Sequence, residues 1–255
     1  MKIKLPFFIF VKTTHLMKIA LLGYGKMGRE IEKIALQRNH TVVLTIDIDN
    51  KEQLTPDNLK KADVAIDFST PDSAYQNIMK CFEADTPIVC GTTGWLDKFE
   101  KVKAYCENNG KTFFYASNYS LGVNIFFNLN RKLARMMNRL EDYNISIEEI
   151  HHIHKLDKPS GTAITLAEGI IDETDRKKRW ELAEKGEKDC IPIKSIREDE
   201  VPGTHRIEYD SPIDSIEIVH TAKNRKGLAL GAILASEFIQ NKTGCYSMSD
   251  IMNTE

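Results

Sequence analysis

The chain has 255 residues, of which 42% are hydrophobic and 28% are charged, and its formal net charge is −2. This length can bury the core of one large domain or of two smaller ones, and we expect two. The balance of 35 basic and 37 acidic residues excludes the basic footprint of a nucleic-acid-binding protein, and no stretch reaches membrane-spanning length. Five scattered cysteines without a CxxC pair favour reduced thiols in a cytoplasmic protein.

The first 16 residues are expected to lie outside the fold. Their apolar run imitates part of a signal peptide, but it is short, Pro6 interrupts it, and no small-residue cleavage site follows. A second methionine, Met17, directly precedes the first strand-like segment. We therefore predict that residues 1–16 are a disordered extension or the product of a mis-assigned start.

A dinucleotide fingerprint opens the ordered part of the chain. A short apolar strand from Ile19 runs into Gly-x-Gly-x-x-Gly at 23–28, a helical pattern follows, and a β-branched strand at 41–46 ends at Asp47. In this context the glycines allow a tight turn, close approach of a pyrophosphate and helix–strand packing, and an acid about 20 residues later binds the ribose. The pattern predicts a dinucleotide site, and the alternative is an ordinary glycine turn in an α/β protein.

Strands and helices continue to alternate after this fingerprint. We predict strands at 63–68, 87–90 and 112–115, and helices opening at Thr55-Pro56, at 72–84 and at 98–108. This alternation indicates right-handed βαβ units and a parallel sheet with helices on both faces. Ligands bind at the carboxyl ends of such strands, where three polar segments fall: Ser69-Thr70, Gly91-Thr92-Thr93 and Ser117-Asn118. These segments are expected to line the cofactor.

The pattern changes after residue 119. We predict a helix at 124–140, a strand from Tyr143, a helix at 163–171, a turn at 201–205 that re-enters a strand, a strand at 216–220 and a final helix at 228–239. The highly charged segment 172–194 is expected to be a solvated helix surface rather than a binding patch.

Proton-transfer groups gather between residues 148 and 163. Three of the seven histidines fall here: His151, His152 and His154. Directly after them, Ser160 can cap a helix and Gly161 leaves backbone N–H groups approachable. Imidazoles titrate near neutral pH, and free N–H groups at a helix start favour anions. The combination suits a small anionic substrate that must be protonated.

A metal site is the alternative explanation for this histidine cluster. In an extended segment His151 and His152 point to opposite faces, and no cysteine lies within ligand spacing. A single histidine would more often be a packed structural residue. The cluster as a whole favours proton transfer, and we predict no metal.

Five motifs together carry a family resemblance: residues 23–28, 67–69, 91–94, 118–124 and 149–163. The run His-His-x-His-Lys-x-Asp-x-Pro-Ser-Gly-Thr-Ala, which begins at His151, is far more specific than the glycine loop. With these motifs the chain from Met17 to its end closely resembles the 4-hydroxy-tetrahydrodipicolinate reductase (dihydrodipicolinate reductase) family of the diaminopimelate branch of lysine biosynthesis.

The resemblance implies an α/β fold with two domains. Residues 17–119 and 228–255 would form a Rossmann-like dinucleotide-binding domain with a parallel sheet, and residues 120–227 a second α/β domain for substrate binding and oligomerisation, in a homotetramer. The implied reaction is the NAD(P)H-dependent reduction of 4-hydroxy-tetrahydrodipicolinate, a small cyclic dicarboxylate, to tetrahydrodipicolinate. A hydride comes from the nicotinamide and a general acid supplies the proton.

The resemblance also assigns the site, position by position. It makes His151 the proton donor and acceptor and Lys155 the second proton donor, and it assigns substrate binding to His152, Gly161 and Thr162. The residues that it assigns to the cofactor are Gly23, Tyr24, Gly25, Lys26, Met27, Gly28, Asp47, Gly91, Thr92, Thr93, Ala116, Ser117, Asn118 and Tyr119.

The chain departs from the family pattern in two places. Many members have a longer glycine loop and an Arg after the ribose-binding acid, which would suit a 2′-phosphate, whereas this chain has Ile48. This difference favours NADH, although Lys26 could still contact a phosphate and use of both cofactors is common in the family. The loop between Arg197 and Gly203 is shortened, which bears on substrate closure or assembly.

Two competing interpretations remain at this point. Another NAD(P)-dependent dehydrogenase of similar two-domain build would leave the histidine run unexplained. A dinucleotide-sensing regulator would bind the cofactor without turnover.

Overall fold

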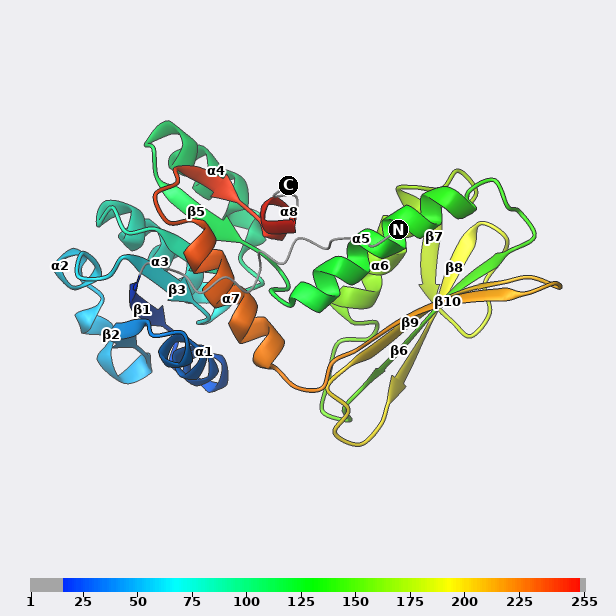
Figure 1. The fold of residues 1–255 in the computed structure, drawn as a ribbon, viewed down its shortest axis with the longest axis horizontal. Coiled ribbons are helices and arrows are strands. Elements are labelled where there is room, and N and C mark those ends of the chain that lie inside the picture. The colour runs from blue at the N-terminus through cyan, green and yellow to red at the C-terminus, as the bar shows by residue number, and fades with distance from the viewer. Residues whose placement is uncertain (1–15, 253–255) are drawn as a thin grey trace, which may run out of the picture. The chain divides into compact units, whose positions relative to one another are not determined.

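The computed structural model describes residues 16–252, which fold into two compact units (Figure 1). One unit contains the chain up to Ser120 together with the segment from Leu228, and the other contains residues 121–227. The prediction for residues 1–16 falls outside the described residues except at Leu16, whose side chain is exposed. Within the described range, no helix combines the length and apolar character needed to cross a membrane.

A six-stranded parallel sheet forms the centre of the first unit, in the order β11-β5-β4-β3-β1-β2. Its strands are β1 (Lys18–Leu22), β2 (Thr41–Ile46), β3 (Val64–Asp67), β4 (Ile88–Cys90), β5 (Thr112–Tyr115) and β11 (Gly244–Tyr246). The helical segments of this part of the chain are α1 (Lys26–Gln37), η2 (Ile48–Gln53), α2 (Pro56–Leu59), α3 (Pro71–Glu83), η3 (Leu96–Lys98), α4 (Phe99–Asn108), α7 (Lys226–Phe238) and α8 (Met248–Met252). Helices cover both faces of the sheet, which confirms the predicted Rossmann-like arrangement (Figure 1).

Burial on both faces explains the composition of these strands. In β1 the residues from Ile19 to Leu22 are almost fully buried, and β3 and β4 are buried throughout. Strands of parallel sheets that helices cover on both sides have such continuous apolar runs rather than alternation. The predicted strands are therefore found, whereas the three-residue β11 and the five-residue α8 were too short for their patterns to indicate.

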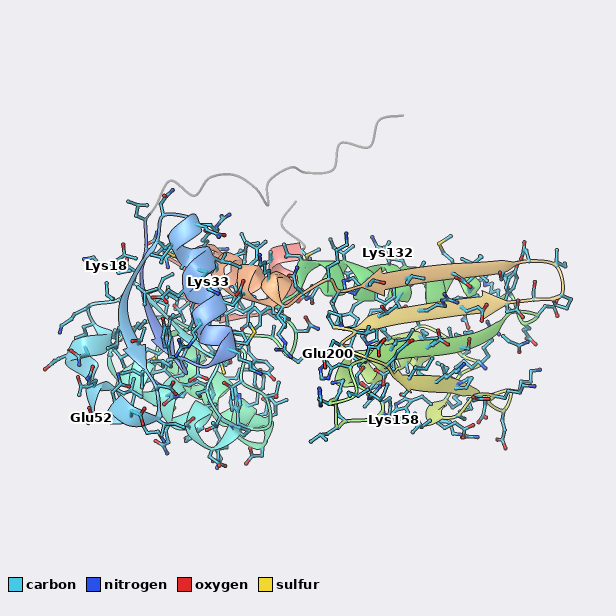
Figure 2. The ribbon with its side chains drawn as sticks, turned by 90° about the horizontal axis from the view of Figure 1, so that it is seen from below. Lys18, Lys33, Glu52, Lys132, Lys158 and Glu200 are labelled. Carbon is cyan, nitrogen blue, oxygen red and sulfur yellow. The ribbon has the colours of Figure 1, made fainter. Side chains whose placement is uncertain are left out.

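A five-stranded mixed sheet forms the second unit, in the order β10-β9-β6-β8-β7, and Figure 2 shows its strands side by side. They are β6 (Asn144–His151), β7 (Arg179–Leu182), β8 (Cys190–Arg197), β9 (Thr204–Asp210) and β10 (Ser215–Thr221). Strands β6, β7 and β8 run parallel, and β9 and β10 pair antiparallel. The helices α5 (Leu121–Met137) and α6 (Gly161–Ile171) pack on one face and enclose an apolar core with it.

The prediction of a solvated helix surface at 172–194 is wrong. The segment contains β7 and the start of β8, whose residues from Cys190 to Ile193 are buried. The side chain of Lys177 is also buried, and its Nζ donates to the carbonyl oxygens of Lys188 at 2.9 Å and Cys190 at 2.8 Å. Pairing of the short apolar run with β6 outweighs the surrounding charge, because a strand needs only a few residues to join a sheet.

Gly231 allows α7 to pack closely on the first unit. A Cβ at Gly231 would lie 1.8 Å from the carbonyl oxygen of Tyr119, which is too close for any atom. The Tyr119 side chain is buried and its hydroxyl donates to the Cys90 carbonyl oxygen at 2.7 Å, so this backbone cannot easily move away.

Gly231→Ala is therefore expected to lower the free energy of unfolding by about 2 kcal/mol, although alanine is normally the better helix former. Gly161→Ala is the control, because Gly161 is also helical but has no atom within 4 Å of the added Cβ. Denaturant titration followed by circular dichroism measures both changes. A Gly231→Ala protein as stable as the wild type would contradict the packing described here.

Candidate active site

A cavity of about 310 Å³ lies in the first unit beside the glycine loop. Its lining residues are Gly23, Gly25, Ile46, Asp47, Ile48, Lys51, Leu54, Phe68, Ser69, Thr70, Ser73, Asn77 and Lys80. Gly23 has a φ of +89°, and a Cβ there would lie 2.3 Å from the Phe68 carbonyl oxygen. At Gly25, by contrast, the space is open. A phosphate group can therefore approach the backbone at the start of α1, as the fingerprint predicts.

Asp47 stands at the wall of this cavity, directly after β2. It is exposed, and its Oδ1 accepts a hydrogen bond from the Ile48 amide at 2.9 Å. The second carboxylate oxygen and the exposed position fit a ribose diol. Two lysines, Lys51 and Lys80, line the same cavity and bring positive charge to it.

Asp67, a buried carboxylate at the end of β3, ties two of the predicted cofactor loops together. It accepts hydrogen bonds from Thr92 Oγ1 at 2.5 Å, Asn77 Nδ2 at 2.7 Å and Ser69 Oγ at 2.9 Å. Burial raises the pKa of Asp67, and these hydrogen bonds oppose the rise. Thr92 therefore holds its loop in place through the hydrogen bond to Asp67 and does not line the cavity. In the sequence, Asp67 stands out only as part of the motif at 67–69.

The other residues predicted for the cofactor do not line this cavity. Tyr24, Lys26 and Met27 lie at or near the start of α1, and the Arg29 guanidinium lies 5.2 Å from the centre of the Tyr24 ring. Gly28 is buried, and a Cβ there would lie 2.3 Å from the Gly23 carbonyl oxygen, so only glycine fits. Thr93 and Ser117 are exposed, Gly91 and Asn118 are half-buried, and Ala116 and Tyr119 are buried.

In the second unit, the alternation of β6 places a carboxylate and an imidazole in the interior. Ile145 and Ile147 point into the core, so Glu149 and His151 point to the same face. Register then decides their neighbours, because β9 places His205 opposite Glu149 and β8 places Ser195 on its other side. Glu149 and His205 are buried in the structure, as is His151.

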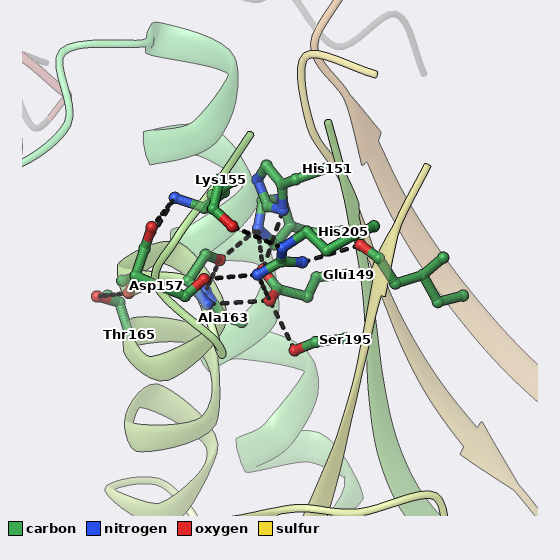
Figure 3. A network of polar contacts seen from close by, with 12 residues as sticks. Glu149, His151, Lys155, Asp157, Ala163, Thr165, Ser195 and His205 are labelled. Atoms are coloured by element: carbon green, nitrogen blue, oxygen red, sulfur yellow. Dashed lines mark hydrogen bonds and ion pairs between the residues drawn. The ribbon is translucent and has the colours of Figure 1, made fainter. Parts of the chain in front are cut away.

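Both oxygens of the Glu149 carboxylate have close polar contacts (Figure 3). Oε1 accepts hydrogen bonds from the Ser195 hydroxyl at 2.7 Å, the Ser160 backbone N–H at 3.0 Å and the Arg197 guanidinium at 3.3 Å. Burial alone would raise the pKa of Glu149, but hydrogen bonds from His151, Ser160 and Ser195 outweigh it and hold the pKa well below its ordinary value. The carboxylate is therefore ionised inside the fold.

The second oxygen, Oε2, faces two imidazoles. It lies 3.1 Å from His151 Nδ1 and 3.8 Å from His205 Nε2. Burial, reinforced by the neighbouring His151, lowers the pKa of His205 to about 3, so His205 is neutral near neutral pH. His205 Nε2 also lies 3.2 Å from the Ser160 hydroxyl. The ion-pair partners of Glu149 are thus mainly His151 and Arg197.

Lys155 is held at the edge of this network. Its Nζ lies 2.7 Å from both carboxylate oxygens of Asp157, and Arg197 donates to the carbonyl oxygens of Lys155 at 3.3 Å and Asp157 at 2.5 Å. Burial would raise the pKa of Asp157, but the hydrogen bond and charge of Lys155 lower it overall. His152 is half-buried, whereas His154 is exposed and pairs with Glu200 at 3.1 Å.

The start of α6 has the predicted form. Ser160 is the N-cap residue, and its hydroxyl accepts a hydrogen bond from the Ala163 backbone N–H at 3.2 Å. Gly161 is exposed with no atom within 4 Å of a built Cβ, and Thr162 is half-buried. The Ser160 and Ala163 N–H groups donate within the protein, so those of Gly161 and Thr162 are the ones open to an anion.

The nearest ligand atoms of Glu149, His151 and His205 lie within 4.8 Å of one another, a spacing that a metal ion can also use. The Arg197 guanidinium lies 3.3 Å from the same carboxylate and would repel a cation. The geometry favours a hydrogen-bonded network.

From the sequence, His151 was predicted as a site residue, whereas no role was predicted for Glu149, Ser195, Arg197 or His205. Only the alternation of apolar residues from Ile145 could have indicated that Glu149 points into the interior.

Family models for the N-terminus and the C-terminus of dihydrodipicolinate reductase match residues 17–119 and 122–252. A 4-hydroxy-tetrahydrodipicolinate reductase from Christiangramia forsetii is 53% identical over 237 residues, covering 93% of this chain and 98% of its own. A reductase of the same name from Thermosipho africanus is 34% identical over 240 residues, covering 92% and 98%.

Solved structures with the same fold include a dipicolinate-bound dihydrodipicolinate reductase from a Paenisporosarcina species. Its TM-score is 0.74 at 24% identity, and the match covers 93% of this chain and 100% of that chain. A probable dehydrogenase from Thermotoga maritima matches with a TM-score of 0.55 at 11% identity, covering 91% and 92%. At these identities the likeness shows the fold alone.

The neutral buried His205 predicts how stability depends on pH. Below its ordinary pKa of 6.5 the unfolded chain protonates this histidine, whereas the folded protein resists protonation down to about pH 3. The unfolded state then binds more protons, so the free energy of unfolding falls with falling pH, by at most about 1.4 kcal/mol per unit from this group.

His205→Gln is expected to flatten this decline between about pH 6.5 and 5, a window above the ordinary carboxylate range. Urea titrations of both proteins across the window measure the difference. His154→Gln, which alters an exposed histidine, is the control and should keep the slope of the wild type. A slope that does not depend on His205 would contradict its neutral, buried state.

Proposed function

The chain belongs to the dihydrodipicolinate reductase family, and we propose that it reduces 4-hydroxy-tetrahydrodipicolinate to tetrahydrodipicolinate with NADH or NADPH, in lysine and diaminopimelate biosynthesis. The observation that carries this proposal is the buried Glu149–His151 pair beside the open start of α6. Such a site can protonate a small anion. The identity to a named reductase over nearly the whole chain supports the same substrate.

The first unit would hold the cofactor, which supplies a hydride when bound. We propose that the backbone at Gly23 and Gly25 contacts the pyrophosphate and that Asp47 contacts the ribose. The other residues of the glycine loop and the segments at 91–93 and 116–119 complete this proposed site. The cavity beside the loop supports the assignment, because its open face lies at Gly25, where a side chain would obstruct a phosphate.

The second unit would hold the cyclic dicarboxylate. We propose that the free N–H groups at Gly161 and Thr162 bind one carboxylate and that His152 contacts the substrate. A helix start offers both unpaired donors and a partial positive charge to such a group. Lys155 brings a fixed positive charge near the same place, although Asp157 pairs with it in this structure.

His151 would supply the proton. Loss of the 4-hydroxyl group as water leaves an unsaturated ring that accepts the hydride. Addition of the hydride places negative charge on this ring system, and a positioned acid removes that charge by donating a proton. With Nδ1 facing Glu149, the other nitrogen, Nε2, is the atom that can exchange a proton with the substrate. Lys155 would be the second proton donor.

We further propose a preference for NADH, a homotetramer and a cytoplasmic location. The Asp47 carboxylate would repel a 2′-phosphate, and Ile48 cannot pair with one, whereas Lys51 and Lys80 leave some use of NADPH open. Assembly through the second unit is supported by Val219, an exposed apolar side chain on the face of β10 opposite to Ile218, which packs against the core. The free thiols of all five cysteines fit a reducing compartment.

The function is tested by coupling dihydrodipicolinate synthase to oxidation of the reduced nicotinamide. The proposal expects oxidation that depends on the synthase, and a non-catalytic sensor would show none above background. An activity with other substrates but not with this one would instead favour another dehydrogenase of the same two-domain build.

Ile48→Arg is expected to raise kcat/KM for NADPH by roughly 10-fold, because a guanidinium pairs strongly with a phosphate. Ile48 is 73% exposed, so the longer side chain needs no repacking. Steady-state kinetics with both cofactors give the ratio, and the wild type should favour NADH. Leu96→Arg adds the same charge at another exposed apolar residue of this unit and should leave the ratio unchanged. A wild-type enzyme that strongly favours NADPH would refute the preference.

His151→Gln is expected to lower kcat roughly 10²–10⁴-fold, the usual effect of losing a general acid, with the affinity for the cofactor little changed. His154→Gln is the matched control, since His154 lies three residues away but is exposed. Steady-state kinetics give kcat, and fluorescence titration gives cofactor affinity. A collapse of cofactor affinity in His151→Gln would assign the residue a structural role instead.

A further inference from the structure

We propose that Glu149 is the positioning residue of this site, and that its one carboxylate sets both the orientation of His151 and the placement of the start of α6. This inference rests on the proposed function, in which His151 donates the proton and α6 binds a carboxylate of the substrate. It assigns a role to a buried charge that neither the glycine fingerprint nor the histidine run requires.

The burial of Glu149 is the first argument. Its side chain is fully buried, on the same face of β6 as Ile145 and Ile147. A buried carboxylate loses its hydration and is tolerated only when donors surround it, and an apolar residue would often stabilise such a position better. The donors on Oε1 and the His151 imidazole 3.1 Å from Oε2 therefore keep a charge where packing alone would favour another isoleucine.

The contact with His151 is the second argument. Oε2 and Nδ1 form an ion pair 3.1 Å apart, and neither atom has a hydrogen-bond partner among the described residues. The carboxylate is therefore the acceptor available to a proton on Nδ1, and it would fix the tautomer of the ring. The opposite nitrogen then faces Gly203, where a built Cβ would lie only 3.0 Å from Nε2. The absence of a side chain at residue 203 leaves the proton-transfer nitrogen uncovered.

The contact with α6 is the third argument. Oε1 accepts a hydrogen bond from the backbone N–H of Ser160, the residue whose hydroxyl caps the helix. The next two residues, Gly161 and Thr162, are those that would bind the carboxylate of the substrate. Displacement of Glu149 would therefore move the proton donor and the substrate-binding backbone together.

Glu149→Gln separates these two contacts. The amide oxygen of glutamine can still accept from Ser160 and Ser195, but its NH₂ group then faces His151 Nδ1. There it opposes the imidazolium, which carries a proton on both nitrogens and donates the one on Nε2, and it leaves a neutral ring with its proton on Nε2. We expect kcat to fall roughly 10²–10⁴-fold while KM for the dicarboxylate changes by less than about 3-fold. Glu148→Gln is the matched control, because this neighbouring carboxylate is only half-buried on the opposite face of β6.

Ser160→Ala tests the role of the helix start in substrate binding, and it keeps the backbone N–H that donates to Glu149. It removes the capping hydroxyl but leaves the Glu149–His151 pair, so we expect KM for the dicarboxylate to rise by about 10-fold with a smaller effect on kcat. A fall in kcat without a rise in KM would contradict the assigned role of the helix start.

The tautomer is measured directly by solid-state nitrogen NMR of protein with isotope-labelled histidine, with His151 assigned by comparison with His151→Gln. At a pH where the ring is neutral, the wild type should carry its proton on Nδ1, and Glu149→Gln should carry it on Nε2. A wild-type ring protonated on Nε2 overturns the proposal without reliance on any variant, as does a Glu149→Gln kcat equal to that of Glu148→Gln.

The NMR measurement tests the role of Glu149 separately from the proposed enzymatic function. The NMR measurement needs no substrate, so a wild type that fails to turn over the dicarboxylate refutes the proposed function and leaves the tautomer result standing. Glu149→Asp retains the charge on a shorter side chain and should keep the Nδ1 proton with partial activity. If Glu149→Gln does not fold, this variant and the wild-type spectrum decide the question.

Discussion

The second unit depends on the stabilisation of one buried negative charge. The Glu149 carboxylate lies where an apolar residue would normally pack, and it remains ionised because strands β6, β8 and the start of α6 each direct a donor at it. Register in the mixed sheet brings these donors together. Removal of the charge would leave several buried donors without a partner, which costs stability. Because every displacement carries this cost, such a network is rigid when it is complete.

The two units differ in the chemical groups that they offer to a ligand. In the first, the absence of a side chain at Gly25 leaves the start of α1 open, and Asp67 holds the surrounding loops through its hydrogen bonds. In the second, side chains of a sheet would supply the acid, and a helix start would bind the anion. A hydride acceptor that is an anion and needs a proton requires both kinds of site.

Sequence patterns predicted the parallel sheet because its strands are continuously apolar and because the glycine loop, helix and acid recur at fixed spacing. They failed at 172–194, where charged residues surround a four-residue apolar run that is enough to form β8. They also missed His205 and Arg197, which lie more than forty residues from Glu149 and meet it only through strand pairing. Contacts set by register are absent from local periodicity.

The central claim is that Glu149 acts through His151, and a double-mutant cycle on kcat tests it most directly. If the claim holds, the protein carrying both Glu149→Gln and His151→Gln should be no slower than His151→Gln alone, because the imidazole that Glu149 positions is already gone. If the two losses in kcat instead multiply, Glu149 contributes independently of His151 and the account is wrong.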